Sequence, residues 1–80
     1  MPLFFGGAKV ADTELLPHQQ RVVEEKQQLD DKISKLWSFI CSDKFDTIVS
    51  DVDERSRLTR QYEVMHQYSG ILAERIAAFV

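Results

Sequence analysis

The 80-residue sequence contains one cysteine, two prolines and three glycines. A single thiol, Cys41, cannot form a disulfide within the chain, which excludes a disulfide-stapled secreted scaffold and favours a reducing compartment. So little proline and glycine excludes a collagen-like repeat or a low-complexity linker. No uncharged apolar run approaches the roughly 18 residues that a membrane span needs. Composition therefore indicates one small soluble domain.

Positive charge is also scarce. The chain has 10 Lys and Arg against 13 Asp and Glu, for a net charge of −3. Because DNA and RNA binding without sequence preference relies on an excess of Lys and Arg, we expect no nucleic-acid polymer as a partner. The sequence has no Cys/His metal spacing, no Gly-rich phosphate loop and only two histidines. These absences predict a protein that is not an enzyme and uses no cofactor or metal ion.

Residues 1–14 predict an N-terminal arm. No basic region precedes Leu3, and Gly6 interrupts the short apolar run, which argues against a signal peptide. Two interpretations are open for this segment. It is a frayed terminus, or its Phe4 and Phe5 dock on a neighbouring subunit.

Residues 15–80 predict a helical hairpin domain that begins with a helix over 17–41. Pro17 suits the first helical turn, and no Gly or Pro interrupts the residues that follow. Apolar residues recur with the spacing of a coiled-coil seam at Val22, Leu29, Ile33, Leu36 and Ile40. Lys26 occupies a seam position, so it either extends to solvent or has an anionic partner. We interpret Cys41 as a small buried residue at the end of this helix.

A second helix is expected over 51–79. Ser50 and Asp53 have the spacing of a capping box at its start. Before it, Lys44 to Val49 predict a short turn or helix that buries Phe45 and Ile48. The seam positions of the second helix are Leu58, Tyr62, Met65, Ser69, Leu72, Ile76 and Phe79. Gly70, beside Ser69, either forms a notch for a second backbone or a ligand, or is a tolerated glycine.

Two long helices with a short connection predict an all-α antiparallel hairpin. Both helices carry apolar residues outside the seam, and leaving these exposed gives a larger apolar patch than monomers normally tolerate. We therefore expect self-association into at least a dimer. The residues concerned are Val23, Trp37 and Phe39 on the first helix and Val64, Tyr68, Ile71 and Ala78 on the second.

Several side chains are candidates for anion binding. Arg21, Lys32 and Lys35 fall within one broad face of the first helix, whereas Lys32 and Ser34 project about 200° apart. Arg75 lies among alanines near the end of the second helix, a setting that suits bidentate phosphate contact. The alternative is that these are ordinary solubilising charges. His18 either stacks on a base or caps the helix, and Tyr62 and Tyr68 are interpreted as core or interface residues.

Two segments carry a family resemblance. LPHQQRVVEEKQQLDDKISKLWSFI and RLTRQYEVMHQYSGILAERIAAF, in this order over about residues 15–79, resemble the phage-encoded anti-CBASS cyclic-oligonucleotide sponges. The same helical hairpin forms part of a related anti-Thoeris sponge of phages. The resemblance implies a hexamer, a trimer of dimers, in the host cytoplasm. Such proteins bind cyclic di- and trinucleotide alarm signals and withhold them from defence effectors without cleaving them.

The resemblance also implies residue roles. In the cyclic dinucleotide pocket between two protomers, His18 corresponds to the stacking residue, often a tyrosine, and Lys32 to the phosphate-binding lysine. Arg21 and Gln19 are alternative contacts in the same turn as His18. In the cyclic trinucleotide pocket, Ser34 corresponds to the hydroxyl residue and Arg75 to the arginine. The competing hypothesis is a coiled-coil hairpin adaptor that binds a host protein through its second apolar stripe.

Overall fold

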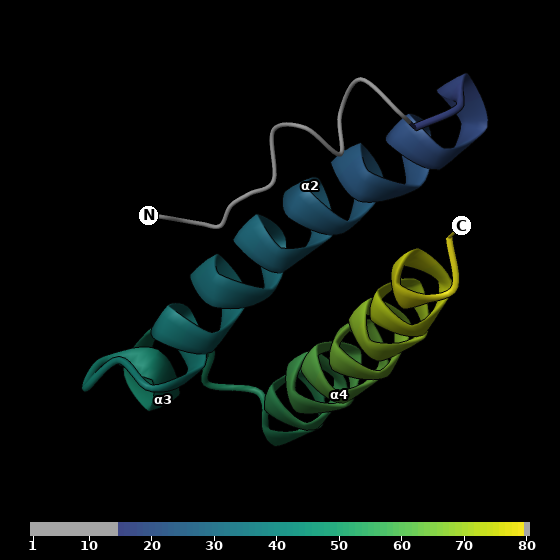
Figure 1. The fold of residues 1–80 in the computed structure, drawn as a ribbon. Helices are drawn as coiled ribbons and strands as arrows, with labels where there is room; N and C mark the ends of the chain where they lie inside the picture. The colour runs from purple at the N-terminus through teal and green to yellow at the C-terminus, as the bar shows by residue number, and fades with distance from the viewer. Residues whose placement is uncertain (1–14, 80) are drawn as a thin grey trace.

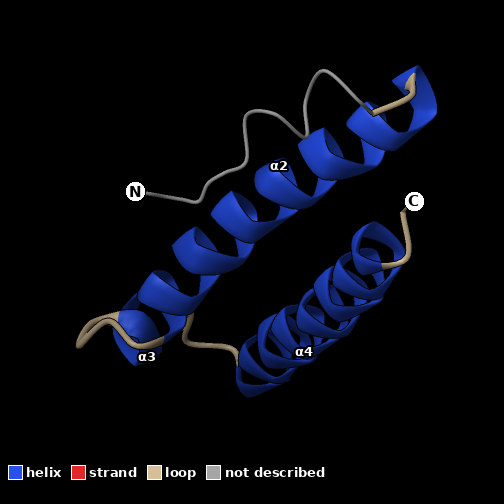
Figure 2. Ribbon diagram, in the orientation of Figure 1, coloured by secondary structure: helices blue, strands red, loops and turns tan. Residues whose placement is uncertain are grey.

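The computed structural model describes residues 15–79, and within that range the chain forms three helices and no strand. Helix α2 spans Pro17–Ile40, α3 spans Phe45–Ile48 and α4 spans Val52–Ala77 (Figures 1 and 2). The two long helices pack against each other in opposite directions, and α3 lies at the closed end of the hairpin. This arrangement confirms the predicted all-α hairpin. The predicted arm, with Phe4 and Phe5, lies outside the described residues.

Helix α2 begins where the sequence indicates. Pro17 occupies the first helical position, and the Gln19 side chain accepts a 2.9 Å hydrogen bond from the backbone N–H of Leu16. The helix ends at Ile40, with Cys41 as its C-cap residue. Cys41 is exposed, so the expectation of a buried thiol was wrong. It lies about 100° around the helix axis from Val22, which points into the core.

The connection at the closed end buries one aromatic ring. Phe45 is 7% exposed, and its ring meets that of Phe39 edge-on with centroids 5.3 Å apart. Ile48 is 62% exposed, so the prediction that it is buried was wrong. The single turn of α3 presents only Phe45 to the core, because the chain leaves the helix at Val49 to reach α4.

Helix α4 is capped by Asp51 rather than by the predicted Ser50. The Asp51 side chain accepts a 2.9 Å hydrogen bond from the backbone N–H of Asp53. Both residue types cap helices well, and the aspartate adds a negative charge next to the positive end of the helix dipole. The prediction of the capping residue was therefore wrong by one position.

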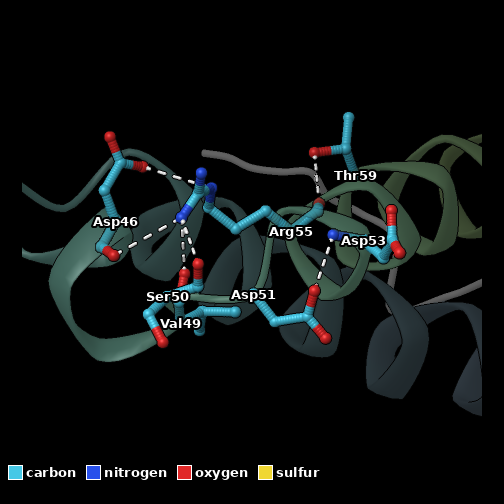
Figure 3. A network of polar contacts seen from close by, with 7 residues as sticks. All are labelled: Asp46, Val49, Ser50, Asp51, Asp53, Arg55 and Thr59. Carbon is cyan, nitrogen blue, oxygen red and sulfur yellow. Dashed lines mark hydrogen bonds and ion pairs between the residues drawn. The ribbon is translucent and has the colours of Figure 1, made fainter.

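Arg55, in the first turn of α4, binds the segment that connects α3 to α4 through hydrogen bonds (Figure 3). Its Nη1 donates hydrogen bonds to the carbonyl oxygens of Val49 at 2.8 Å, Ser50 at 3.3 Å and Asp46 at 3.4 Å. Its Nε lies 3.7 Å from the carboxylate of Asp46. One guanidinium thus satisfies carbonyl groups that the end of α3 leaves without helical partners.

The core is thin and lies between the two long helices. Val22, Leu29 and Leu72 are buried, and Leu72 is completely shielded from solvent. Four partly buried seam residues pack against them: Ile33, Met65, Ile76 and Phe79. Lys26, at its seam position, lies 2.6 Å from the Asp30 carboxylate, so it has an anionic partner.

Candidate functional site on the hairpin faces

Two contacts between α2 and α4 fix the register of the hairpin. Ser69 Oγ donates a 2.5 Å hydrogen bond to Asp30 Oδ1, and the rings of Trp37 and Tyr62 stack with centroids 4.7 Å apart. The residue numbers in both pairs sum to 99, so a residue n of α2 lies level with residue 99 − n of α4. An α-helix rises about 1.5 Å and turns about 100° per residue. Together these values place each candidate residue along and around the hairpin.

One flank of the hairpin carries most of the predicted cations. Arg21 and Lys32 project within about 20° of each other from α2, on the side away from Trp37. Arg75 projects from the same flank of α4. We call this flank the cation face. His18 lies one turn before Arg21, and all four of these side chains are exposed.

The opposite flank carries Ser34, which is exposed and lies one turn before Trp37 on the same side of α2. We call this flank the Ser34 face. In the register above, Ser34 lies level with Met65, and therefore about 15 Å along the axis from Arg75. The predicted trinucleotide residues, Ser34 and Arg75, are thus on opposite faces of one chain.

The predicted dinucleotide residues are also incompletely assembled in a single chain. His18 and Arg21 are neighbours, but Lys32 is about 21 Å from His18 along α2. A stacking ring and a phosphate contact this far apart cannot both touch one nucleotide unit. Neither predicted pocket is therefore complete within one hairpin.

The cations of residues 15–79 divide into two groups. Lys26, Lys35, Arg55 and Arg57 each lie within 4.0 Å of a carboxylate oxygen. By contrast, Arg21, Lys32 and Arg75 make no ion pair with another described residue, and the same holds for Lys44 and Arg60. Three of the four cations predicted to bind an anion are thus available in this part of the chain, whereas Lys35 is paired with Asp31.

Asp30 is an acceptor that joins the two helices. Burial raises the pKa of its carboxyl group, but hydrogen bonds from Lys26 and Ser69 and the positive charges of Lys26 and His66 outweigh burial. The pKa of Asp30 therefore lies below its ordinary value of 3.8. Asp30 therefore stays ionised at neutral pH and pairs with Lys26.

A cluster of rings on the Ser34 face was not predicted as a site. Tyr62 stacks on Trp37 with an interplanar angle of 28°, and the His66 ring centroid lies 5.9 Å from that of Tyr62. We call these three residues the aromatic ladder. Trp37 remains 49% exposed. The ladder joins residues 25 positions apart in the sequence, so only the register of the hairpin could have indicated it.

An apolar stripe on α4 continues the cation face. Val64, Tyr68 and Ile71 are 63%, 40% and 56% exposed. Their alternating spacings of four and three residues continue through Arg75 to Ala78, which is the spacing of a second coiled-coil seam. The prediction that this stripe lies outside the hairpin core is confirmed.

The chain also matches a known family over residues 16–78, which cover α2, the connection and α4. The model of that family is described as Sequestin. The chain belongs to the Sequestin family. Comparison with curated proteins and with solved structures gives no significant match.

The Sequestin match includes all five predicted ligand residues: His18, Arg21, Lys32, Ser34 and Arg75. The family name is consistent with a protein that sequesters a ligand rather than transforming it. Residues 15–79 contain no group of three or more His, Cys, Asp or Glu side chains that could hold a metal ion. Neither long helix of this Sequestin member has the length and hydropathy required to cross a membrane.

Proposed function

We propose that this Sequestin member is a phage counter-defence protein that binds cyclic di- and trinucleotides without cleaving them. By withholding these signals in the host cytoplasm, it blocks the activation of CBASS effectors. The observation that carries the proposal is the Sequestin match over 16–78, a segment that contains every residue of the two pockets implied by the resemblance to anti-CBASS sponges.

The charge distribution supports this function. Arg21, Lys32 and Arg75 are exposed and have no carboxylate partner among the described residues. Unpaired Lys and Arg side chains bind phosphate through charge-assisted hydrogen bonds, and Arg does so in a bidentate manner. A cyclic dinucleotide would take its stacking contact from His18, with Arg21 as the alternative contact one turn later, and its phosphate contact from Lys32.

Both pockets require more than one protomer in this proposal. His18 and Lys32 are about 21 Å apart along α2, and Ser34 and Arg75 lie on opposite faces of the hairpin. A hexamer built as a trimer of dimers would bring the missing partners from neighbouring chains. The exposed stripe of Val64, Tyr68 and Ile71 is the surface that this assembly would cover.

Isothermal titration with cyclic dinucleotides and cyclic tri-adenylate tests the function. We expect tight binding of both classes, and recovery of intact ligand after the protein is digested. Lys32→Ala should weaken dinucleotide binding at least about tenfold, because a charge-assisted hydrogen bond contributes about 1.5–3 kcal/mol. Arg75→Ala should weaken trinucleotide binding by a similar factor while sparing dinucleotides.

Two matched controls separate pocket residues from general positive charge. Lys44→Ala and Arg60→Ala each remove an exposed cation that is also unpaired among residues 15–79, but neither residue belongs to a proposed pocket. Both variants should bind like the parent protein. Equal losses in all four variants would contradict specific pockets, and a linearised product would contradict sequestration.

A second candidate function is a hairpin adaptor that binds a host protein. The observation that favours it is the apolar stripe on α4, whose Val64, Tyr68 and Ile71 side chains are exposed. Sedimentation of Ile71→Glu distinguishes the two. If the stripe holds the protomers together, this variant should be monomeric and lose cyclic nucleotides. A parent protein that is monomeric and binds no cyclic nucleotide would favour the adaptor.

A further inference from the structure

The Ser34 face carries a groove that the proposed phosphate-binding residues do not use. Its lining comes from two successive turns of α4: Tyr62, Glu63, His66 and Gln67. The groove has a volume of about 430 Å³ and is open to solvent. Tyr62 and His66 belong to the aromatic ladder, so the groove borders two mutually tilted rings as well as the polar side chains of Glu63 and Gln67.

The rings favour a planar ligand. Tyr62 is held in place by its 4.7 Å stack on Trp37, which comes from the other long helix, and the His66 ring lies 5.9 Å from that of Tyr62. Rings already fixed by packing lose little conformational freedom when a ligand stacks on them. Aromatic side chains that remain accessible provide stacking surfaces for nucleobases.

The polar side chains of the groove indicate which hydrogen-bonding groups the planar ligand must have. Glu63 and Gln67 are exposed, and neither makes a hydrogen bond or ion pair with another described residue. A carboxylate accepts hydrogen bonds and donates none, so Glu63 favours a ligand edge with N–H donors. Two adjacent N–H donors match the two oxygens of one carboxylate.

The charge around the groove argues against a phosphate contact there. Its lining contains no Lys or Arg side chain to bind a phosphate, and it contains the Glu63 carboxylate. We therefore propose that the groove is a base-recognition site for guanine, stacked on the exposed His66 ring beside Tyr62, with its N1–H and N2–H donors on the Glu63 carboxylate. This inference rests on the proposed function, to which it adds selectivity for one base. The groove lies on the Ser34 face, whereas the proposed phosphate-binding residues lie on the cation face.

A series of three nucleotides tests it. Guanosine, inosine and adenosine 5′-monophosphates carry the same phosphate but differ at purine positions 1 and 2. Guanosine has N–H donors at both positions, inosine has one at position 1 only, and adenosine has none at either. Trp37 is the only tryptophan, so its emission reports on the ladder alone. We expect saturable quenching with an affinity order of guanosine, then inosine, then adenosine, with about tenfold between the first and last. Amide shifts at Glu63, His66 and Gln67 should accompany it.

Variants distinguish this site from the cation face. Glu63→Gln should remove the difference between the three nucleotides, whereas Glu74→Gln, an exposed glutamate on the same helix, should preserve it. Lys32→Ala should leave the series unchanged. Equal affinities for all three nucleotides, or no response from Trp37 and the groove amides, would overturn the proposal. Lys32-dependent binding of cyclic dinucleotides in that case would leave the proposed function standing.

Discussion

Ser69 joins the two long helices of the hairpin by donating a 2.5 Å hydrogen bond to Asp30. The Ser69 side chain is buried, and the second oxygen of the same carboxylate accepts a 2.6 Å hydrogen bond from Lys26. These three residues form a side-chain hydrogen-bond chain that connects α2 to α4. The thin apolar core is thus supplemented by a polar connection between the two long helices.

Replacing this serine should destabilise the hairpin. Ser69→Ala removes the donor and leaves Asp30 paired with Lys26 alone, at an expected cost of about 1 kcal/mol. The value lies below the range of about 1.5–3 kcal/mol for a charged acceptor, because Asp30 is partly exposed and water can replace the serine. Urea unfolding measures the change. Ser34→Ala, at an exposed serine, should differ from the parent by less than about 0.5 kcal/mol.

Stability should depend on pH through Asp30. Its pKa is lower in the folded chain than its ordinary value of 3.8, so the ionised carboxylate stabilises the fold above that value. This contribution should be lost as the pH falls below 3.8 and through the folded pKa. Thermal unfolding of the parent and of Asp30→Asn between neutral and acid pH checks this. The stability difference between them should shrink on acidification, and a constant difference would contradict the role of Asp30.

The stability of the segment that connects α3 to α4 should depend on Arg55. Arg55→Met removes the donor that three carbonyl oxygens share, and we expect a loss of about 1–3 kcal/mol in the free energy of unfolding. Arg60→Met provides the control, since Arg60 makes no hydrogen bond or ion pair with another described residue. Equal stabilities of the two variants would show that water satisfies these carbonyls equally well.

Gly70 provides a test of what approaches α4. A Cβ atom built at this position meets no atom within 4 Å in the single chain. Gly70→Ala should therefore stabilise the isolated hairpin by about 1 kcal/mol, because alanine has the higher helix propensity. Analytical ultracentrifugation and ligand titration of the variant complete the test. Weaker assembly or ligand binding despite greater stability would identify Gly70 as the notch where a neighbouring chain or ligand comes close.

The hairpin was predictable because its signals are periodic. The recurrence of Val22, Leu29 and Leu36 determines which side of α2 is buried, whatever the details of the connection. The connection was less predictable, since Ser50 and Asp51 are both good capping residues and their choice depends on how the chain leaves α3. The predicted burial of Ile48 was wrong because a four-residue helix is too short to show a repeat of apolar residues that would indicate its buried side.

The candidate sites were likewise predictable only where the signal lies within one helix. Spacing along α2 placed Lys32 and Ser34 on different sides, as the structure has them. The distance between Ser34 and Arg75, and the stacking of Trp37 on Tyr62, depend on the register between helices. Register arises from packing across the hairpin, and no pattern within either helix specifies it.

The antiparallel register also sets an order of stability along the molecule. Contacts near the connection join residues close in sequence, such as Arg55 with Val49, whereas those at the open end close loops of nearly the whole described chain. The open end, where both long helices terminate away from the connection, is therefore expected to fray first. His18, Arg21 and Arg75 all lie toward that end. A ligand or neighbouring chain held there would therefore tighten the part of the fold that opens most easily, and slowed amide exchange at the end of α4 would report its binding.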